Sequence, residues 1–351
     1  MVERGFTAAA AVFGDQFPSW LRDGFISRFR CAPCWIVHLP NSALGCAVAD
    51  ITPISRDNAH ITNPPGIGTS ARATARRRCK TLWMVEELLG GIDNAGKVVR
   101  EGDVVLRPAP ANAEHLHALL EFLASGGFPS PRPLGFRDGG REALKYIPGE
   151  TSTPPYPHAW VTADETLIEI GRMLRALHDT TRDFVPSPDA VWTTDLADPQ
   201  GGAVICHNDV CIENVVVSSG RVEGLLDFDF AAPGRPTWDL AMTARYWVPL
   251  RDPTSAAATN RDHLDPFERV RILVDGYGAD AQVRREFIGV LMEIEEVALR
   301  FVLDRVNRGI PAFVEMWEDL GAHDWHRRKM AWLTDNQSRI DDALAVISTE
   351  P

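Results

Sequence analysis

The chain has 351 residues, which is enough for two lobes or domains that each bury a core. With 45% hydrophobic and 24% charged residues it has the composition of a globular protein, and no apolar run approaches the roughly 18 residues of a membrane-spanning helix. The net charge of −12 argues against nucleic-acid binding, and it either attracts a cationic substrate or simply aids solubility.

The first 83 residues lack helix or strand periodicity and carry a basic run, Arg76 to Arg78. Such a segment is typical of a poorly ordered region, so we expect an N-terminal extension over 1–83. Regular patterning begins near Met84. Two interpretations follow: the natural chain begins at Met84, or the extension is a functional basic tail.

Six cysteines are scattered along the chain, unlike the dense framework of a secreted disulfide-rich protein. Cys31 and Cys34 have C-x-x-C spacing, but no second pair stands at a zinc-like distance, so the pattern is a weak signal for a redox or zinc site. Asp15 interrupts the only Ala-rich stretch near the N-terminus, and no cleavage site follows. We therefore expect a cytoplasmic protein.

Residues 84–148 have the pattern of a small β-rich lobe. Short apolar runs flank turn signals, and leucines at helical spacing follow them. The predicted elements are strands at 97–100 and 104–107 around a turn, a helix at 113–124 and a strand at 144–147.

Residues 149–351 are predicted to form a larger, mostly helical lobe, so the fold class is α+β. Asp164 or Thr162 is expected to cap the first of these helices. Short strands are predicted at 204–206, 214–217 and 222–227, and helices at 164–178, 237–247, 266–277, 281–306, 311–319 and 324–347.

The most informative segment contains His207, Asp209 and Asn214, followed by an apolar strand and, thirteen residues after Asn214, by Asp227. A hairpin turning at 218–220 would bring Asn214 and Asp227 side by side, with Asp209 facing them. Phosphoryl transfer needs a carboxylate that orients the attacking hydroxyl, and oxygen ligands for magnesium. This set of residue types fits that chemistry.

The segment resembles the catalytic loop and metal-binding Asp of the aminoglycoside phosphotransferase family, over roughly 84–300 of this sequence. The resemblance implies a two-lobed protein-kinase-like fold with ATP, or alternatively GTP, as phosphoryl donor and magnesium as cofactor. It implies that Asp209 is the catalytic base, that His207 supports the loop, and that Asn214 and Asp227 bind magnesium. Asp239 resembles the Asp that braces the catalytic loop.

On the nucleotide side, Gly90 and Gly91 lie where the family has its phosphate-covering loop. The family usually places a lysine on the following strand, and here the position is predicted to hold Arg107, with Arg100 as a second candidate. Arginine can bind phosphate through two parallel hydrogen bonds. We expect the helix partner of this cation to be Glu114 or Glu121.

Tyr146 and Ile147 resemble the hinge that pairs with adenine through backbone groups. The alternative is an ordinary connecting strand. Only eleven residues separate Asp227 from Asp239, which leaves no room for the activation segment of a protein kinase. The acceptor is therefore predicted to be a hydroxyl of a small molecule.

Acidic residues in the C-terminal helices either bind a cationic acceptor or are solvated helix faces: Glu293, Glu295, Glu296, Glu315, Glu318 and Asp319. Trp238, Tyr246 and Trp247 either line the acceptor pocket or belong to the core. Two other functions compete with a small-molecule kinase. One is a nucleotide-binding pseudokinase, suggested by the missing strand lysine. The other is a metal-dependent hydrolase using His207, Asp209, Asp227 and Asp229. The sequence does not specify the acceptor or the oligomeric state.

Overall fold

The computed structural model of the chain describes residues 85–88, 97–154 and 156–345. The predicted extension over 1–83, its C-x-x-C pair and the Gly90-Gly91 loop lie outside the described residues. The boundaries of the extension and of the two lobes at 83/84 and 148/149 therefore stay predictions.

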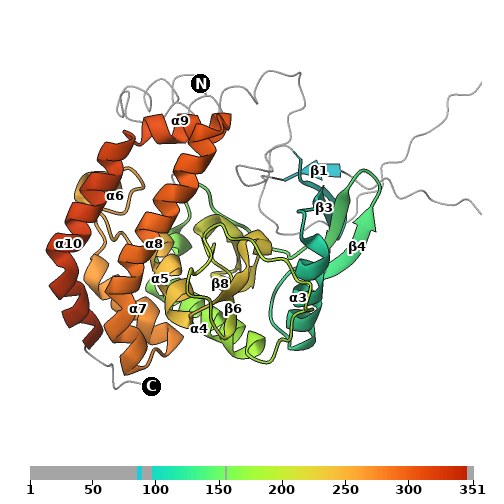
Figure 1. Ribbon diagram of the computed structural model, residues 1–351, viewed down its shortest axis with the longest axis horizontal. Coiled ribbons are helices and arrows are strands. Elements are labelled where there is room, and N and C mark those ends of the chain that lie inside the picture. The colour runs from blue at the N-terminus through green and yellow to red at the C-terminus, as the bar shows by residue number, and fades with distance from the viewer. Residues whose placement is uncertain (1–84, 89–96, 155, 346–351) are drawn as a thin grey trace, which may run out of the picture. The chain divides into compact units, whose positions relative to one another are not determined.

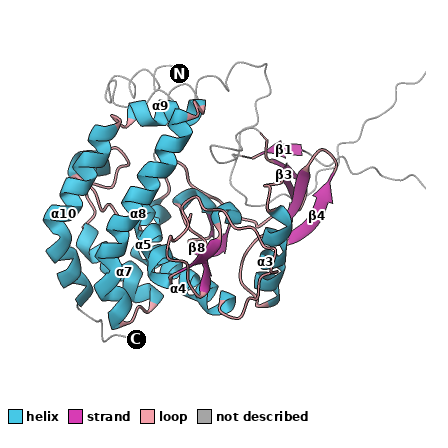
Figure 2. Cartoon of the chain, in the orientation of Figure 1, coloured by secondary structure: helices cyan, strands magenta, loops and turns pink. Residues whose placement is uncertain are grey.

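The N-terminal lobe is built on an antiparallel five-stranded sheet in the order β1-β2-β3-β5-β4 (Figure 2). The strands and the helix of this lobe are β1 (Val85–Glu87), β2 (Val99–Glu101), β3 (Val104–Pro108), α3 (Ala113–Ser125), β4 (Pro133–Arg137) and β5 (Arg141–Lys145). The predicted β2–β3 hairpin is confirmed, with Val99 opposite Leu106. Its two-residue loop places Gly102 at a φ of 63°, which favours glycine.

The rest of this sheet departs from the predicted pattern at its edge. β5 ends at Lys145, two residues before the predicted end, and β4 is a strand where only an extended segment was expected. Pro133 starts β4, which is the edge strand of the sheet, where the missing N–H of proline costs no ladder bond. Helix α3 matches its prediction and buries its leucines.

The C-terminal lobe is mainly helical, and α7, α8 and α10 lie side by side in it (Figure 1). Its helices are α4 (Asp164–Thr181), α5 (Pro236–Trp247), α6 (Pro253–Ala257), α7 (Pro266–Tyr277), α8 (Ala281–Asn307), α9 (Pro311–Asp319) and α10 (His323–Ala345), with 3-10 turns at Ala159–Val161, Ile212–Asn214 and Phe228–Phe230. The six helices predicted for this lobe are confirmed within a few residues.

Helices α4 and α7 approach each other closely because glycines lie at their contact. A Cβ on Gly171 would come within 2.6 Å of the Leu273 carbonyl oxygen, and one on Gly276 within 2.8 Å of the Ile168 carbonyl oxygen. Larger residues at these two positions would push the helices apart. The periodicity of each helix predicts its apolar face, but this pairing is a property of the tertiary structure.

The predicted cap of α4 is wrong. The residue before the helix is Ala163, which offers no side-chain hydrogen bond. The Asp164 carboxylate instead accepts a bond from Arg269 at 2.9 Å. The short helix α6 was not predicted, because its five residues carry no periodic signal.

Four short strands of this lobe form two antiparallel pairs. Strand β6 (Val204–Cys206) pairs with β9 (Ala232–Gly234), and β7 (Val215–Ser218) pairs with β8 (Arg221–Leu225). Ser219 and Gly220 form the β7–β8 turn, both with positive φ, as in the favoured two-residue hairpin. The predicted hairpin and its turn are confirmed.

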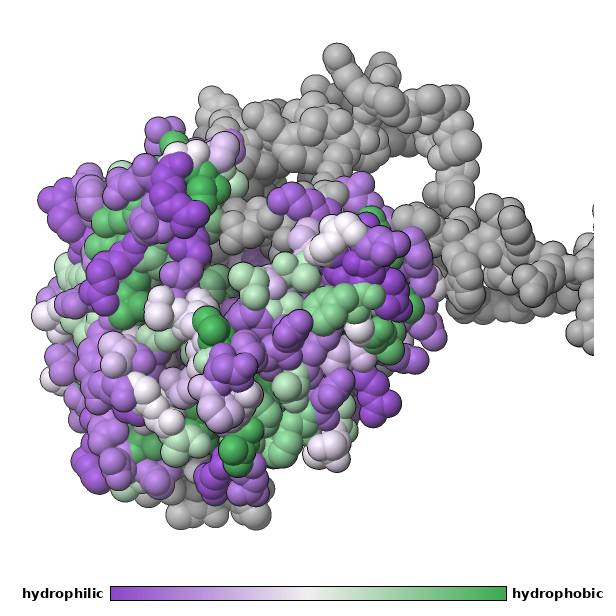
Figure 3. Space-filling view, turned by 45° about the vertical axis from the view of Figure 1, so that its right-hand side comes forward, coloured by the Kyte–Doolittle hydropathy of each residue, from purple (hydrophilic) through white to green (hydrophobic). Residues whose placement is uncertain are grey.

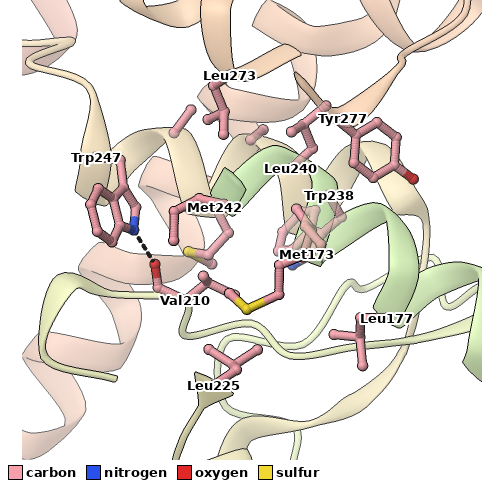
Figure 4. Close-up of a cluster of buried hydrophobic side chains, with 14 of the residues drawn as sticks. Met173, Leu177, Val210, Leu225, Trp238, Leu240, Met242, Trp247, Leu273 and Tyr277 are labelled. Atoms are coloured by element: carbon pink, nitrogen blue, oxygen red, sulfur yellow. Dashed lines mark hydrogen bonds between the residues drawn. The ribbon is translucent and has the colours of Figure 1, made fainter. Parts of the chain in front are cut away.

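The core of the C-terminal lobe lies where α4, α5 and α7 meet the catalytic-loop segment (Figure 4). Trp238 and Trp247 are fully buried, and the Trp247 indole donates to the Val210 carbonyl oxygen at 2.8 Å. Of the two interpretations for these tryptophans, the core is therefore correct.

Within the described residues, no helix is both long enough and apolar enough to cross a bilayer. On the face drawn in Figure 3, hydrophobic residues are interspersed with hydrophilic ones.

Candidate active site

The predicted catalytic loop runs from His207 to Asn214, between β6 and β7. The side-chain amide of Asn214 donates to the backbone carbonyl of Asp209 at 2.9 Å and to its carboxylate at 3.0 Å. Both bonds use the amide nitrogen, so the amide oxygen is the atom of this side chain that can bind a cation. The five-residue spacing thus holds the two side chains in direct contact.

Asp239, in the first turn of α5, anchors the catalytic loop through hydrogen bonds from the backbone of the loop. Its carboxylate is fully buried and accepts the N–H of His207 at 2.7 Å and the N–H of Asn208 at 2.8 Å. It also accepts a bond from His178 at 3.0 Å. Burial alone would raise the pKa of Asp239, but these hydrogen bonds outweigh burial and hold it below its usual value. The geometry matches the bracing expected of Asp239.

His207 is buried and links the loop to the strand pair. Its Nδ1 accepts the N–H of Asp209 at 3.2 Å, and its Nε2 lies 2.9 Å from the Leu226 carbonyl oxygen. Because a carbonyl can only accept, Nε2 carries the proton and the ring is neutral, in agreement with a pKa lowered by burial. This arrangement suits the predicted supporting role rather than proton transfer.

The β7–β8 hairpin brings Asp227 next to Asn214. The N–H of Leu226 donates to the Asn214 carbonyl at 2.7 Å, and Asp227 is the next residue along the chain. Asp227 has a left-handed backbone, φ 59° and ψ 71°, which few residues other than glycine, Asn and Asp adopt. Asp209, Asn214 and Asp227 therefore lie together, as their spacing predicted.

Arg107 of β3 reaches from the N-terminal lobe into this group. It donates to Asp227 at 2.8 Å, to Asp229 at 2.5 Å and to Glu142 at 2.6 Å. We call these four residues the acidic cluster: three carboxylates around one guanidinium. The Arg107 side chain is 12% exposed, whereas Asp227 and Asp229 are 30% and 25% exposed. The two aspartates can thus be reached by a ligand.

The expected helix partner of Arg107 is wrong. Glu114 and Glu121 are both exposed on α3, and the partner is Glu142, directly opposite Arg107 in the β3–β5 register. Helix α3 contributes His117 instead, whose Nε2 lies 2.6 Å from the second Glu142 oxygen. Sequence reasoning missed both residues, because the pairing of β3 with β5 crosses an intervening helix and strand.

Arg100, the second candidate for the phosphate-binding cation, lies elsewhere. Its guanidinium stacks 3.7 Å from the Tyr146 ring centroid and pairs with Glu86 at 3.4 Å. The Tyr146 N–H donates to the Asp103 carbonyl at 2.8 Å, so this donor is already used within the lobe. A hinge at Tyr146 and Ile147 would depend on the remaining backbone groups.

Electrostatics single out two carboxylates of the site. Burial, with the charges of Asp227 and Glu213, raises the pKa of Asp209 to about 7, although hydrogen bonds from Tyr246 and Asn214 oppose the shift. Burial and the neighbouring Asp227 charge raise the pKa of Asp229 to about 7, against the opposing effect of Arg107. The three carboxylates in turn raise the pKa of Arg107 despite its burial. Perturbed groups that gather in this way are typical of functional sites.

The oxygen atoms of Asn214 and of the two aspartates of the acidic cluster fit a hard divalent cation. Asn214 offers an amide oxygen, and Asp227 and Asp229 offer carboxylates, which are the ligand types that magnesium takes in proteins. A single guanidinium leaves an excess of negative charge among these groups, which a divalent cation would neutralise.

A second set of charges lies near Asp209, whose carboxylate charge acts on Arg245. We call Arg245, Arg251, Arg261 and Lys329 the basic cluster. Glu295 from α8 pairs with Lys329 and, at 3.1 Å, with Arg245, and both Glu295 and Lys329 are almost fully buried. Nearby, the Tyr156 hydroxyl donates to Glu213 at 3.0 Å. Sequence reasoning missed these cations, because nothing in their local sequence marks them as neighbours.

The acidic residues of the C-terminal helices do not form one surface for a cation. The Glu295 carboxylate already pairs with Lys329 and Arg245, and Glu293 pairs with Arg235 at 3.0 Å. Glu213 in the catalytic loop is partly buried against Tyr156. Tyr246, unlike the two buried tryptophans, is partly exposed beside Asp209.

A sequence model of the phosphotransferase enzyme family matches residues 85–190 and 187–273, more than half of the chain. The chain belongs to the phosphotransferase enzyme family. Membership confirms the predicted family and, with it, the predicted enzyme class, a small-molecule kinase.

The chain is also similar to two proteins with assigned functions. It is 31% identical to the trifolitoxin immunity protein of Rhizobium leguminosarum bv. trifolii, over 71% of this chain and 95% of that one. It is 25% identical to the homoserine kinase of Granulibacter bethesdensis, over 62% of this chain and 78% of that one.

The fold is shared with solved members of the kinase-like group. The crystal structure of a choline/ethanolamine kinase family protein from Mesorhizobium loti superposes with a TM-score of 0.50 at 17% identity, covering 76% of this chain and 94% of that one. This likeness confirms the predicted two-lobed kinase-like fold.

Proposed function

We propose that the chain is an ATP- and magnesium-dependent kinase that phosphorylates a hydroxyl of a small molecule, with Asp209 as catalytic base. The observation that carries the proposal is the convergence of three oxygen-bearing side chains on one point. Asp209 contacts Asn214 at 3.0 Å, and the β7–β8 hairpin sets Asp227 beside Asn214. Family membership supports the reaction class.

In this proposal Asp209 orients the acceptor hydroxyl for attack on the γ-phosphorus. As the new O–P bond forms and the bond to the ADP oxygen breaks, the hydroxyl proton passes to the Asp209 carboxylate. The contact with Asn214 fixes the carboxylate in position, and its raised pKa, about 7, brings its basicity close to physiological pH. GTP is the alternative donor.

Asn214 and Asp227, with Asp229 as a further carboxylate, would hold magnesium. When bound, the metal neutralises charge on the phosphate oxygens. Arg107 would bind phosphate oxygens in place of the usual strand lysine, since its fork of donors already lies beside Asp227 and Asp229. Glu142 and His117 hold Arg107 in this position.

ADP release in the presence of MgATP tests the proposal. The acceptor panel should contain hydroxylated amino acids, amino alcohols and aminoglycosides, because the named relatives include homoserine kinases. We expect ADP release that depends on an acceptor and is lost in Asp209→Ala. Asp138→Ala, at an exposed loop position, is the matched control and should retain activity.

Two outcomes would contradict the proposal. Thermal stabilisation by MgATP without ADP release under any acceptor would indicate a nucleotide-binding pseudokinase. Release of phosphate from simple esters without ATP would indicate a hydrolase.

A second candidate concerns the biological use of the same chemistry. The relative with 31% identity carries the name of an immunity protein, and the chain covers 95% of it. The acceptor would then be a toxin or antibiotic whose phosphorylation protects the producing cell. Expression in a sensitive strain tests this candidate: wild type should raise tolerance to a toxin, and Asp209→Ala should not.

A further inference from the structure

The basic cluster is unusual among the buried cations of this chain. Arg261 is buried, and Arg245 and Arg251 are partly buried. Three buried arginines elsewhere each have a carboxylate partner: Arg269 with Asp164 at 2.9 Å, Arg284 with Asp275 at 2.6 Å, and Arg305 with Asp195 at 2.8 Å. Within 85–88, 97–154 and 156–345, neither Arg251 nor Arg261 has a carboxylate within ion-pair distance.

The hydrogen bonds of these two arginines do not neutralise them. Arg251 donates to the Arg245 carbonyl oxygen at 3.0 Å, and its buried Nε has no hydrogen-bond partner among the described residues. Arg261 donates to the Tyr246 carbonyl oxygen at 2.5 Å and to Thr259 at 3.1 Å. Carbonyl and hydroxyl oxygens satisfy N–H groups but leave the positive charge uncompensated.

The cations also repel one another. Burial, with the charges of Arg261 and Arg245, lowers the pKa of Arg251 to about 10. Burial lowers the pKa of Lys329 to about 7, although the Glu295 charge raises it. The charges of Arg245 and Arg251 lower the pKa of Lys329 further. Three carboxylates, Glu295, Glu213 and Asp209, stand near the four cations. The region lacks negative charge, which is the reverse of the acidic cluster.

The basic cluster lies beside the proposed base. Tyr246, whose backbone oxygen holds Arg261, interacts with the Asp209 carboxylate through its hydroxyl. The Asp209 charge also acts on Arg245. Since Arg251 and Arg261 donate to the backbone of Arg245 and Tyr246, a group bound at Arg251 would belong to a molecule near the proposed base.

We propose that Arg251, supported by Arg245 and Arg261, binds a carboxylate of the acceptor, and that the acceptor is a small hydroxy acid such as a hydroxylated amino acid. The inference rests on the proposed function and names its substrate class. A carboxylate supplies the missing negative charge through charge-assisted hydrogen bonds, and arginine presents a planar fork that matches it. A polycationic sugar would add positive charge to the same region.

Two probes that differ only in the carboxylate test the inference: L-homoserine and the corresponding aminopropanol. For wild type we expect kcat/KM, followed as ADP release, to be at least about tenfold higher for L-homoserine, the size of one charge-assisted hydrogen bond. Arg251→Gln should reduce this ratio toward one, mainly through KM, and Arg251→Lys should restore part of it. Arg308→Gln, at an exposed position of the C-terminal lobe, should leave the ratio unchanged.

Calorimetry with MgADP provides a readout that does not depend on turnover. L-Homoserine should bind wild type and bind Arg251→Gln at least about tenfold more weakly. Turnover of aminopropanol but not L-homoserine would overturn the inference and leave the proposed function intact. Binding of L-homoserine that needs Arg251, without ADP release, would support the inference and contradict the proposed function. Absence of L-homoserine binding to wild type would overturn the inference.

Discussion

The acidic and basic clusters have opposite charge balances. In the acidic cluster three carboxylates surround the single guanidinium of Arg107, and two of them are a quarter or more exposed. In the basic cluster four cations share the buried carboxylate of Glu295 and the nearby carboxylates of Glu213 and Asp209. Each region is incomplete in a different sense: one lacks positive charge, the other negative.

This difference assigns different ligands to the two regions. Uncompensated buried charge is costly, so evolution retains it where a ligand completes it. The acidic cluster suits a divalent cation and its phosphates, and the basic cluster suits an acid. Five predictions test this difference between the two clusters, in order of decreasing expected effect.

Glu295→Gln should have the largest effect, on stability. It leaves Lys329 and Arg245 buried without their carboxylate, and breaking a buried ion pair in this way costs about 3–5 kcal/mol. Urea unfolding followed by circular dichroism measures the change. Lys329→Met should cost less, because Arg245 still pairs with Glu295. A larger loss in Lys329→Met would show that the cations are not in excess.

The same carboxylate should make the protein sensitive to acid. Burial alone would raise the pKa of Glu295, but Lys329 and Arg245 outweigh burial and lower it to about 2. A group with a depressed folded-state pKa contributes stability above its unfolded-state pKa, and that contribution is lost as the pH falls toward the folded-state value. We expect wild type to lose stability between about pH 4.5 and pH 2 more steeply than Glu295→Gln. Equal slopes in urea titrations at several pH values would contradict this assignment.

Asp227→Asn should cost about 10²-fold or more in kcat, because a metal-binding charge contributes several kcal/mol to the transition state. The magnesium concentration for half-maximal ADP release should also rise, and removal of magnesium with a chelator should abolish ADP release in wild type. Asp138→Asn, at an exposed position, is the matched control. Unchanged magnesium dependence would remove Asp227 from the metal site.

Arg107→Lys should weaken ATP binding about tenfold. A lysine keeps the charge but loses the fork that contacts Glu142, Asp227 and Asp229 at once, and a hydrogen bond between charged groups is worth about 1.5–3 kcal/mol. Titration calorimetry with ATP measures the affinity. Tighter binding by the lysine variant would mean that Arg107 competes with the nucleotide and does not bind it.

Arg100→Gln should have the smallest effect, with ATP affinity changed by less than about twofold. Its partners are the Tyr146 ring and an exposed carboxylate, and exposed ion pairs contribute about 0–1 kcal/mol. The same calorimetry applies. A loss as large as that of Arg107→Lys would return Arg100 to the nucleotide site.

Local sequence patterns sufficed to predict most helices and strands, and also the proximity of the site residues that are close together in the chain. Helical periodicity placed six helices of the C-terminal lobe within a few residues, because each buries one apolar stripe. The spacing of Asp209, Asn214 and Asp227 sufficed to predict their meeting, because a loop and one hairpin join them.

Contacts between side chains that are distant in the sequence could be found only from the tertiary structure. Glu142, rather than a glutamate of α3, became the partner of Arg107, since β5 pairs with β3 across an intervening helix and strand. Arg251, Arg261 and Lys329 gather near Arg245 from segments as much as 84 residues beyond it, which no local pattern predicts. The charge of each side chain follows from its residue type, but which charges are compensated depends on packing. The gathering of cations in the basic cluster is therefore a result of the tertiary structure.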